Sequence, residues 1–142
     1  MRTFVSAKLH NLRVTGASLD YIGSVTIDAD LLEAADIAPY EAIDIVNLNN
    51  GERWTTYALP GTSGVFTLNG GGARLGLAGD RCVIMSYRRE HEFSGARSVF
   101  VDERNEIVRQ LRYPLLEDTD GAPDLRVSDA PVATSSTVSD RG

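Results

Sequence analysis

A glycine and a serine, Gly23 and Ser24, stand together inside the stretch YIGSVTID (21–28), which otherwise has the composition of a β-strand. Glycine weakens a strand because it costs backbone entropy and offers no side chain to pack. The pair also places a hydroxyl nucleophile one residue from an unshielded carbonyl, so that an attack would be intramolecular. For an isolated Gly-Ser pair, a β-bulge with a surface serine is the commoner explanation.

No other pattern of reactive residues identifies a site by itself. The sequence has no Ser-His-Asp spacing and no cluster of cysteine and histidine that would bind a metal. The three glycines at 70–72 lack the Lys-Ser or Lys-Thr that follows in a phosphate-binding loop. These residues alone therefore predict a soluble β-barrel without assigning its chemistry.

The composition is that of one soluble domain. The chain has 142 residues, of which 42% are hydrophobic, enough for one hydrophobic core. A net charge of −6 argues against a nucleic-acid partner. No apolar run is long enough for a membrane span or a signal peptide, and the single cysteine, Cys82, cannot form an intrachain disulfide. We expect a cytoplasmic protein with no membrane partner.

The elements that position the reactive residues are expected to be short strands separated by turn signals. A hairpin is predicted at 42–59, where Asn49-Asn50-Gly51 favours a tight turn, and another at 97–110 around Glu103–Asn105. A short helix is predicted at 28–37, with Asp28 or Asp30 as its cap. Other strands are expected at 3–5, 12–15, 21–27, 65–69 and 81–87, and a turn or short helix is expected from the glycine cluster to residue 77. This pattern predicts an all-β barrel or sandwich.

The composition changes at about Pro114. Residues 114–142 are rich in Pro, Ser, Thr and Asp, show no periodicity, and carry six acids and two arginines, so they contribute −4 of the net charge. Such a segment cannot bury enough apolar surface to offset its ordering entropy. We predict one β-barrel domain over residues 1–113 and an acidic, disordered tail over residues 114–142.

Four short motifs in a fixed order carry a family resemblance. They are Lys8-Leu9-His10, Tyr21-Ile22-Gly23-Ser24, the run NGERWTTY at 50–57, and Asn69-Gly70. In this order, residues 1–112 resemble the aspartate 1-decarboxylases, a pyruvoyl-dependent family that converts L-aspartate to β-alanine for pantothenate and coenzyme A synthesis. The resemblance implies a double-psi β-barrel, assembled as a homotetramer with active sites between neighbouring subunits. It implies neither a metal nor pyridoxal phosphate.

The resemblance also implies that the chain cuts itself between Gly23 and Ser24. The serine hydroxyl attacks the glycine carbonyl, the resulting ester is eliminated, and hydrolysis leaves a pyruvoyl group at the new terminus. Thr56 matches the residue that stabilises the oxyanion during this processing. The pyruvoyl ketone then forms a Schiff base with the substrate amine and accepts electrons as carbon dioxide leaves. Tyr57 matches the tyrosine that returns a proton to the α-carbon.

The remaining family positions are assigned to substrate binding. Arg53 matches the arginine that holds a substrate carboxylate, a role suited to a planar two-pronged donor, and Lys8 supplies a second positive charge. The other matches are His10, Asn69, and the backbone N–H groups of Gly71 and Gly72. Several of these assignments also have a structural alternative: Arg53 as a solvated hairpin arginine, Tyr57 as a half-buried barrel tyrosine, His10 as a satisfied strand histidine, and the three glycines as a flexible loop. Tyr21 is assigned equally to the core or to the pocket wall.

Departures from the family pattern leave the substrate open. They are Gly71-Gly72 and Arg74 in place of alanines and a histidine, Asp20 in place of a histidine, Val25 in place of a small residue, and a shorter loop between Tyr57 and Asn69. A pyruvoyl decarboxylase for another acidic amino acid therefore stays open, as does an unprocessed β-barrel that acts as a binding or regulatory module. Some relatives need a helper protein for cleavage, so a maturation helper stays open as a partner of this chain.

Overall fold

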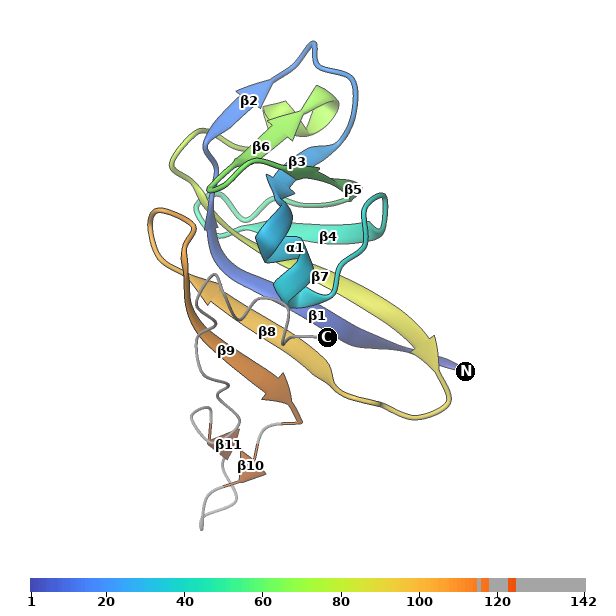
Figure 1. Ribbon diagram of the computed structural model, residues 1–142. Helices are drawn as coiled ribbons and strands as arrows, with labels where there is room; N and C mark the ends of the chain where they lie inside the picture. Colours follow the sequence, from blue (N-terminus) through green and yellow to red (C-terminus); the bar gives the residue numbers. More distant parts are fainter. Residues whose placement is uncertain (115, 118–122, 125–142) are drawn as a thin grey trace.

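The computed structural model describes residues 1–114, 116–117 and 123–124, which are mostly β-strand (Figure 1). The strands are β1 (Arg2–Arg13), β2 (Gly16–Ser18), β3 (Val25–Asp28), β4 (Ala42–Asn47), β5 (Arg53–Gly61), β6 (Phe66–Asn69), β7 (Arg81–Glu90), β8 (Ala96–Val101), β9 (Ile107–Tyr113), β10 (Leu116–Glu117) and β11 (Pro123–Asp124). An α-helix, α1 (Ala29–Ala35), and a 3₁₀ helix, η1 (Gly70–Arg74), interrupt them. The predicted all-β class is confirmed.

Nine strands form one sheet in the order β2-β6-β3-β5-β4-β7-β1-β8-β9, and β10 pairs with β11. The pairs β1–β8, β3–β5 and β2–β6 are parallel, and the other pairs are antiparallel. Figure 1 shows α1 lying across the sheet in front of β7 and β1. Among the described residues no ladder joins the edge strands β2 and β9. The double-psi closure therefore stays a prediction.

The core follows the alternation of the strands and the apolar side of α1. Buried side chains come from every part of the sheet: Leu9, Leu12, Val25, Ile27, Ile43, Ile45, Phe66, Leu68, Ile84 and Val99. Helix α1 adds Leu31, Leu32, Ala34 and Ala35. Of the two predicted caps, Asp28 is the N-cap, and its carboxylate accepts the N–H of Asp30 at 2.8 Å. Such a cap stabilises a short helix by about 1 kcal/mol.

The prediction of separate strands at 3–5 and 12–15 is wrong, because one strand, β1, runs from residue 2 to residue 13. Its register with β7 shifts between Val5 and Ala7 and again between Leu9 and Leu12. Each shift inserts residues that oppose no partner and moves the apolar positions out of a simple period of two. The regular alternation of apolar and polar residues that indicates a strand is therefore interrupted at these two places in β1.

The prediction of a strand over 21–27 is also wrong in its first half. Residues 21–24 form a bend, and β3 begins only at Val25. Gly23 has φ +110°, a conformation that ends regular strand geometry and that glycine adopts without a side-chain clash. The Gly-Ser pair therefore lies at the entry of a strand, with Ser24 directly before it.

The two predicted hairpins are confirmed. The β4–β5 connection spans residues 48–52, longer than a two-residue turn, and Gly51 takes φ +79° there. Asn47 and Asn50 close this loop by accepting the backbone N–H groups of Asn49 and Glu52, at 2.8 and 2.9 Å. The β8–β9 hairpin turns at 102–106, as expected. The predicted disordered tail lies almost entirely outside the described residues.

Candidate active site

Ser24 is held between two neighbouring strands just before β3. Its side chain is buried, and its hydroxyl donates to the backbone carbonyl of Tyr57 on β5. Its own carbonyl accepts the backbone N–H of Asn69 on β6 at 2.9 Å. Since β3 pairs with both β5 and β6, the sheet fixes this serine from both sides.

The carbonyl of Gly23 lies against the start of η1. A Cβ atom on Gly70 would stand 3.1 Å from that oxygen and 3.5 Å from the carbonyl oxygen of Tyr21. Gly70 also has φ +60°, so glycine suits this position both for its backbone conformation and for the close approach. Gly71 and Gly72 were predicted to contact the substrate, whereas Gly70, part of the Asn69-Gly70 motif, was given no role of its own, although the glycine run was the signal for one.

The other two glycines of η1 have different surroundings. A Cβ atom on Gly72 would lie 3.1 Å from Nε1 of Trp54, whereas one on Gly71 would meet nothing within 4 Å. Trp54 Nε1 is buried and has no hydrogen-bond partner in the described part of the chain. Gly71 therefore borders open space, and Gly72 packs against the indole.

Tyr57, on β5, places its hydroxyl beside Gly23. A Cβ atom built on Gly23 would lie 3.9 Å from the Tyr57 hydroxyl oxygen and 3.3 Å from Leu59 Cδ1. The Tyr57 ring stacks on the ring of Tyr40, with centroids 6.0 Å apart and planes at 19°. Sequence reasoning placed Tyr57 in the site and missed Tyr40, for which no local pattern gives a signal.

Thr56 and Asn69 lie next to this cluster but make other contacts. Thr56 is paired in register with buried Ile43, on the face of β5 opposite Tyr57. Its hydroxyl makes no hydrogen bond among the described residues. The side-chain amide of Asn69 donates to the Thr26 hydroxyl at 3.0 Å, so only its backbone N–H contacts Ser24.

Arg53 belongs to a second cluster, on the outer face of β4, β5 and β7. Its Nη2 donates to Asp44 Oδ2 at 3.2 Å and to the Tyr87 hydroxyl at 3.1 Å. Asp44 Oδ1 accepts the Thr55 hydroxyl at 2.6 Å. That hydroxyl, followed by the Arg53 guanidinium and Tyr87, lowers the pKa of Asp44, so the carboxylate is charged at neutral pH. The remaining donors of the guanidinium fork stay available for a ligand.

Asp44 and Tyr87 were not assigned by sequence reasoning. Neither belongs to a motif, and the sheet register alone brings them to Arg53: Asp44 pairs with Thr55 on one side and with Met85 on the other. Burial, followed by the neighbouring Asp44 charge, raises the pKa of Tyr87. Its phenol therefore stays protonated at neutral pH and continues to orient the arginine.

Lys8 and His10 lie on β1, remote from Ser24 within the same chain. Strands β4 and β7 lie between β1 and β5 in the sheet. Three strand spacings of about 4.8 Å therefore separate β1 from β5 by about 14 Å along the sheet. The Lys8 ammonium contacts the Tyr113 hydroxyl at 3.5 Å and lies 5.7 Å from the centre of that ring. His10 stacks on Phe100, with centroids 4.4 Å apart and planes at 9°.

His10 is neutral at physiological pH. Burial, with the positive charge of Lys8 second, lowers the pKa of His10 to about 4. Its Nε2 is buried without a hydrogen-bond partner among the described residues. A contact with substrate through this side chain would therefore use a neutral imidazole.

The lowered pKa of His10 predicts a pH-dependent stability. Between pH 6.5 and about 4 the unfolded chain binds a proton at this residue and the folded chain does not, so the free energy of unfolding should fall as the pH is lowered through this window. His10→Phe, which keeps a ring against Phe100, should flatten that slope. Urea unfolding at a fixed protein concentration over this pH range measures it.

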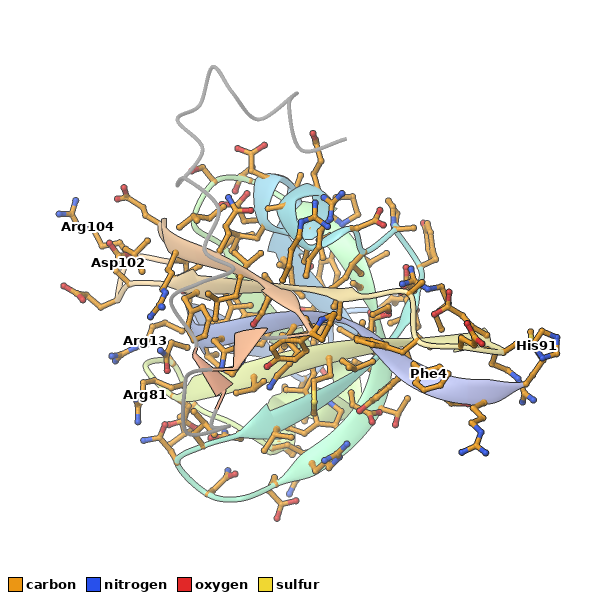
Figure 2. The ribbon with its side chains drawn as sticks, turned by 90° about the horizontal axis from the view of Figure 1, so that it is seen from below. Phe4, Arg13, Arg81, His91, Asp102 and Arg104 are labelled. Carbon is orange, nitrogen blue, oxygen red and sulfur yellow. The ribbon has the colours of Figure 1, made fainter. Side chains whose placement is uncertain are left out.

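The matched control is His91→Gln. His91 follows the end of β7, at the right-hand tip of the molecule in Figure 2, and its side chain is exposed. This variant should keep the parental slope between pH 6.5 and about 4. Identical slopes for the parent and His10→Phe would show that His10 does not cause the dependence.

The described residues contain no group of three or more His, Cys, Asp or Glu side chains placed to hold a metal ion. No helix in that part of the chain is long and apolar enough to cross a membrane. The structure brings together Gly23, Ser24, Tyr57, Asn69 and Gly70. Arg53 lies farther along β5 on the same exposed face as Tyr57, and Lys8 and His10 lie on β1.

The fold is a small β-sheet domain in which the candidate site residues Gly23, Ser24, Tyr57 and Asn69 gather at the start of β3. The family model described as aspartate decarboxylase matches residues 1–108. The chain therefore belongs to the aspartate decarboxylase family, and the predicted class, a decarboxylase, is confirmed.

Curated relatives support this assignment over most of the chain. The aspartate 1-decarboxylase of Acaryochloris marina is 47% identical over 113 residues, which cover 75% of this chain and 86% of the relative. The enzyme of that name from Trichormus variabilis is 44% identical, over a match that covers 79% of this chain and 93% of the relative. The one from Salinibacter ruber is 40% identical over 144 residues and covers 91% and 97%.

Proposed function

We propose that this chain cleaves itself between Gly23 and Ser24 and then converts L-aspartate to β-alanine and carbon dioxide, for pantothenate and coenzyme A synthesis. The observation that carries the proposal is the position of Ser24. It is buried, its hydroxyl is tied to the Tyr57 carbonyl, and the bond before it is exposed to the Tyr57 phenol and to Gly70. Family membership supplies the reaction class.

The chain's own residues perform the cleavage. The Ser24 hydroxyl donates its proton toward the Tyr57 carbonyl, which leaves an oxygen lone pair for the Gly23 carbonyl carbon. Oγ bonds to that carbon, the carbon–nitrogen bond breaks, and the Ser24 nitrogen takes up a proton to give an ester. Loss of the Ser24 α-proton then expels the Gly23 carboxylate, and water replaces the nitrogen, which leaves as ammonia.

Gly70 and Asn69 contribute to the cleavage of the Gly23–Ser24 bond in different ways. The absence of a Cβ at Gly70 keeps the approach to the Gly23 oxygen open, where negative charge develops. The Asn69 N–H holds the Ser24 carbonyl and keeps the new chain terminus in place after cleavage. We assign Thr56 a secondary role in processing, because its hydroxyl needs a local rearrangement to reach this oxygen.

The surroundings of Ser24 fit a pyruvoyl group made from that residue, since they offer an N–H donor for its amide carbonyl and a phenol beside it. Such a group supplies an electrophilic carbonyl for the substrate amine and an acceptor for the electrons that carbon dioxide leaves behind. Tyr57 holds the proton that returns to the substrate α-carbon. The open side of Gly71 leaves room for the substrate backbone.

Substrate binding completes the site between two copies of the chain. Arg53 and Tyr57 lie four residues apart on one face of β5, so their Cα atoms are about 13 Å apart, and within the chain the Arg53 guanidinium is held by Asp44 and Tyr87. Lys8 and His10 are farther away. We therefore assign Arg53, Lys8 and His10 of one copy to the Ser24 site of its neighbour, in a homotetramer.

Denaturing mass spectrometry of the purified protein tests the proposal. The expected result is two chains, residues 1–23 and residues 24–142, with the larger one lighter by one ammonia than a chain that begins with serine. The same measurement after incubation with a cell extract tests for a maturation helper. A chain that stays intact under both conditions, with no carbon dioxide released from aspartate, would overturn the proposed function.

A further inference from the structure

Tyr40 occupies a backbone conformation that a bulky residue rarely adopts. It lies between α1 and β4 with φ +69°, in the left-handed region, which glycine and asparagine adopt readily and in which a large side chain is strained. Its N–H donates to the Ala58 carbonyl at 2.7 Å, a contact that any residue other than proline would make equally well. The turn itself therefore does not require tyrosine.

Burial does not explain Tyr40 either. Tyr40 is 73% exposed within the chain, so the little apolar surface that its ring buries contributes little to the stability of the fold. Strain at an exposed residue persists where the side chain serves a purpose other than stability. The ring contact described for Tyr40 is the one with Tyr57.

The stack restricts the ring that carries the reactive hydroxyl. Tyr57 is 38% exposed, and its hydroxyl lies beside Gly23. A half-exposed ring on a strand face is free to change rotamer unless a neighbour packs against it. Tyr40 supplies that neighbour, at 6.0 Å between centroids.

We propose that Tyr40 is a positioning residue that holds the Tyr57 phenol over the Gly23–Ser24 bond and, after cleavage, over the substrate α-carbon. The proposal rests on the assignment of Tyr57 as the proton donor. It predicts that Tyr40 acts through its ring, since the ring makes the contact, and that it affects proton delivery more than substrate affinity.

Two variants separate this role from a structural one. Tyr40→Asn accepts the positive φ and removes the ring, whereas Tyr40→Phe keeps the ring and removes only the hydroxyl. Both should fold and cleave completely. For processed Tyr40→Asn we expect kcat for aspartate to fall about tenfold, with KM within about twofold of the parent, because the proton donor loses its alignment. Tyr40→Phe should keep the parental values.

A second readout does not depend on activity. Nitration of Tyr57 by tetranitromethane, followed by peptide mass mapping, reports how well its ring is shielded. The rate should rise several-fold in Tyr40→Asn and stay parental in Tyr40→Phe, in line with the loss or retention of the stack. Three results would overturn the proposal. Tyr40→Asn could keep the parental kcat and nitration rate, or it could change KM alone. Tyr40→Phe could fail to keep the parental kcat and nitration rate. If the parent itself releases no carbon dioxide, the proposed function fails, while nitration still reports the contact.

Discussion

Replacing Ser24 with alanine is expected to leave a single intact chain and to lower carbon dioxide release from aspartate by at least about a thousandfold. The hydroxyl is both the nucleophile for cleavage and the precursor of the prosthetic group, so no other side chain can replace it. Loss of its hydrogen bond to the Tyr57 carbonyl costs about 1 kcal/mol, too little to unfold the protein. Denaturing mass spectrometry and a carbon dioxide assay measure the two effects.

Ser18→Ala is the matched control for this variant. Ser18 lies at the end of β2, close to Ser24 in the sequence, and its side chain is exposed. It should cleave and turn over like the parent. Circular dichroism should show the same sheet content for both variants. Cleavage between residues 23 and 24 in Ser24→Ala would contradict the mechanism.

Arg53→Ala is expected to lower kcat/KM for aspartate by roughly a hundredfold, because a charged, two-pronged contact to a carboxylate is lost. Coexpression of Arg53→Ala with Ser24→Ala should recover about a quarter of the parental activity. If each site is shared by two copies and the two variants mix at random, about one site in four combines an intact Ser24 from one copy with an intact Arg53 from its neighbour. A carbon dioxide assay on hybrids isolated through two different affinity tags measures this recovery.

The control arginine for this experiment is Arg104. It lies in the β8–β9 turn beside Asp102, at the end of the molecule opposite His91 (Figure 2), and forms an exposed ion pair with Glu106 at 3.7 Å. Arg104→Ala should retain parental activity. If hybrids of the two defective chains are no more active than either alone, the site is contained in one copy and the shared arrangement is wrong.

Most of the fold could be predicted from local patterns. The alternating runs on both sides of Asn49-Asn50-Gly51 and of 102–106 are hairpins, and the acidic cap before the apolar side of α1 identified the helix. Prediction failed at β1, where two bulges disturb the alternation. It failed again at 21–24, where Gly23 turns the chain before β3 begins.

The site was predicted unevenly for a related reason. Gly23, Ser24, Tyr57 and Asn69 belong to short motifs, and the structure brings them together. Their individual roles stay predictions until the variants are measured. Tyr40, Asp44 and Tyr87 belong to no motif and were identified only through the contacts they make. Gly70 belongs to the Asn69-Gly70 motif, but its place beside the Gly23 carbonyl was identified only from the structure.

The amino-acid sequence by itself determined the family, the all-β class and the serine at which the chain is proposed to cut, because these depend on motifs and periodicities carried by neighbouring residues. Only the tertiary structure decided what surrounds that serine. Strand register ties its hydroxyl to one neighbouring strand and its carbonyl to the other. The same register holds Arg53 between Asp44 and Tyr87, and it places Lys8 on β1, three strands away from β5. Pairing across a sheet depends on how segments distant in the sequence align, so no single segment determines it.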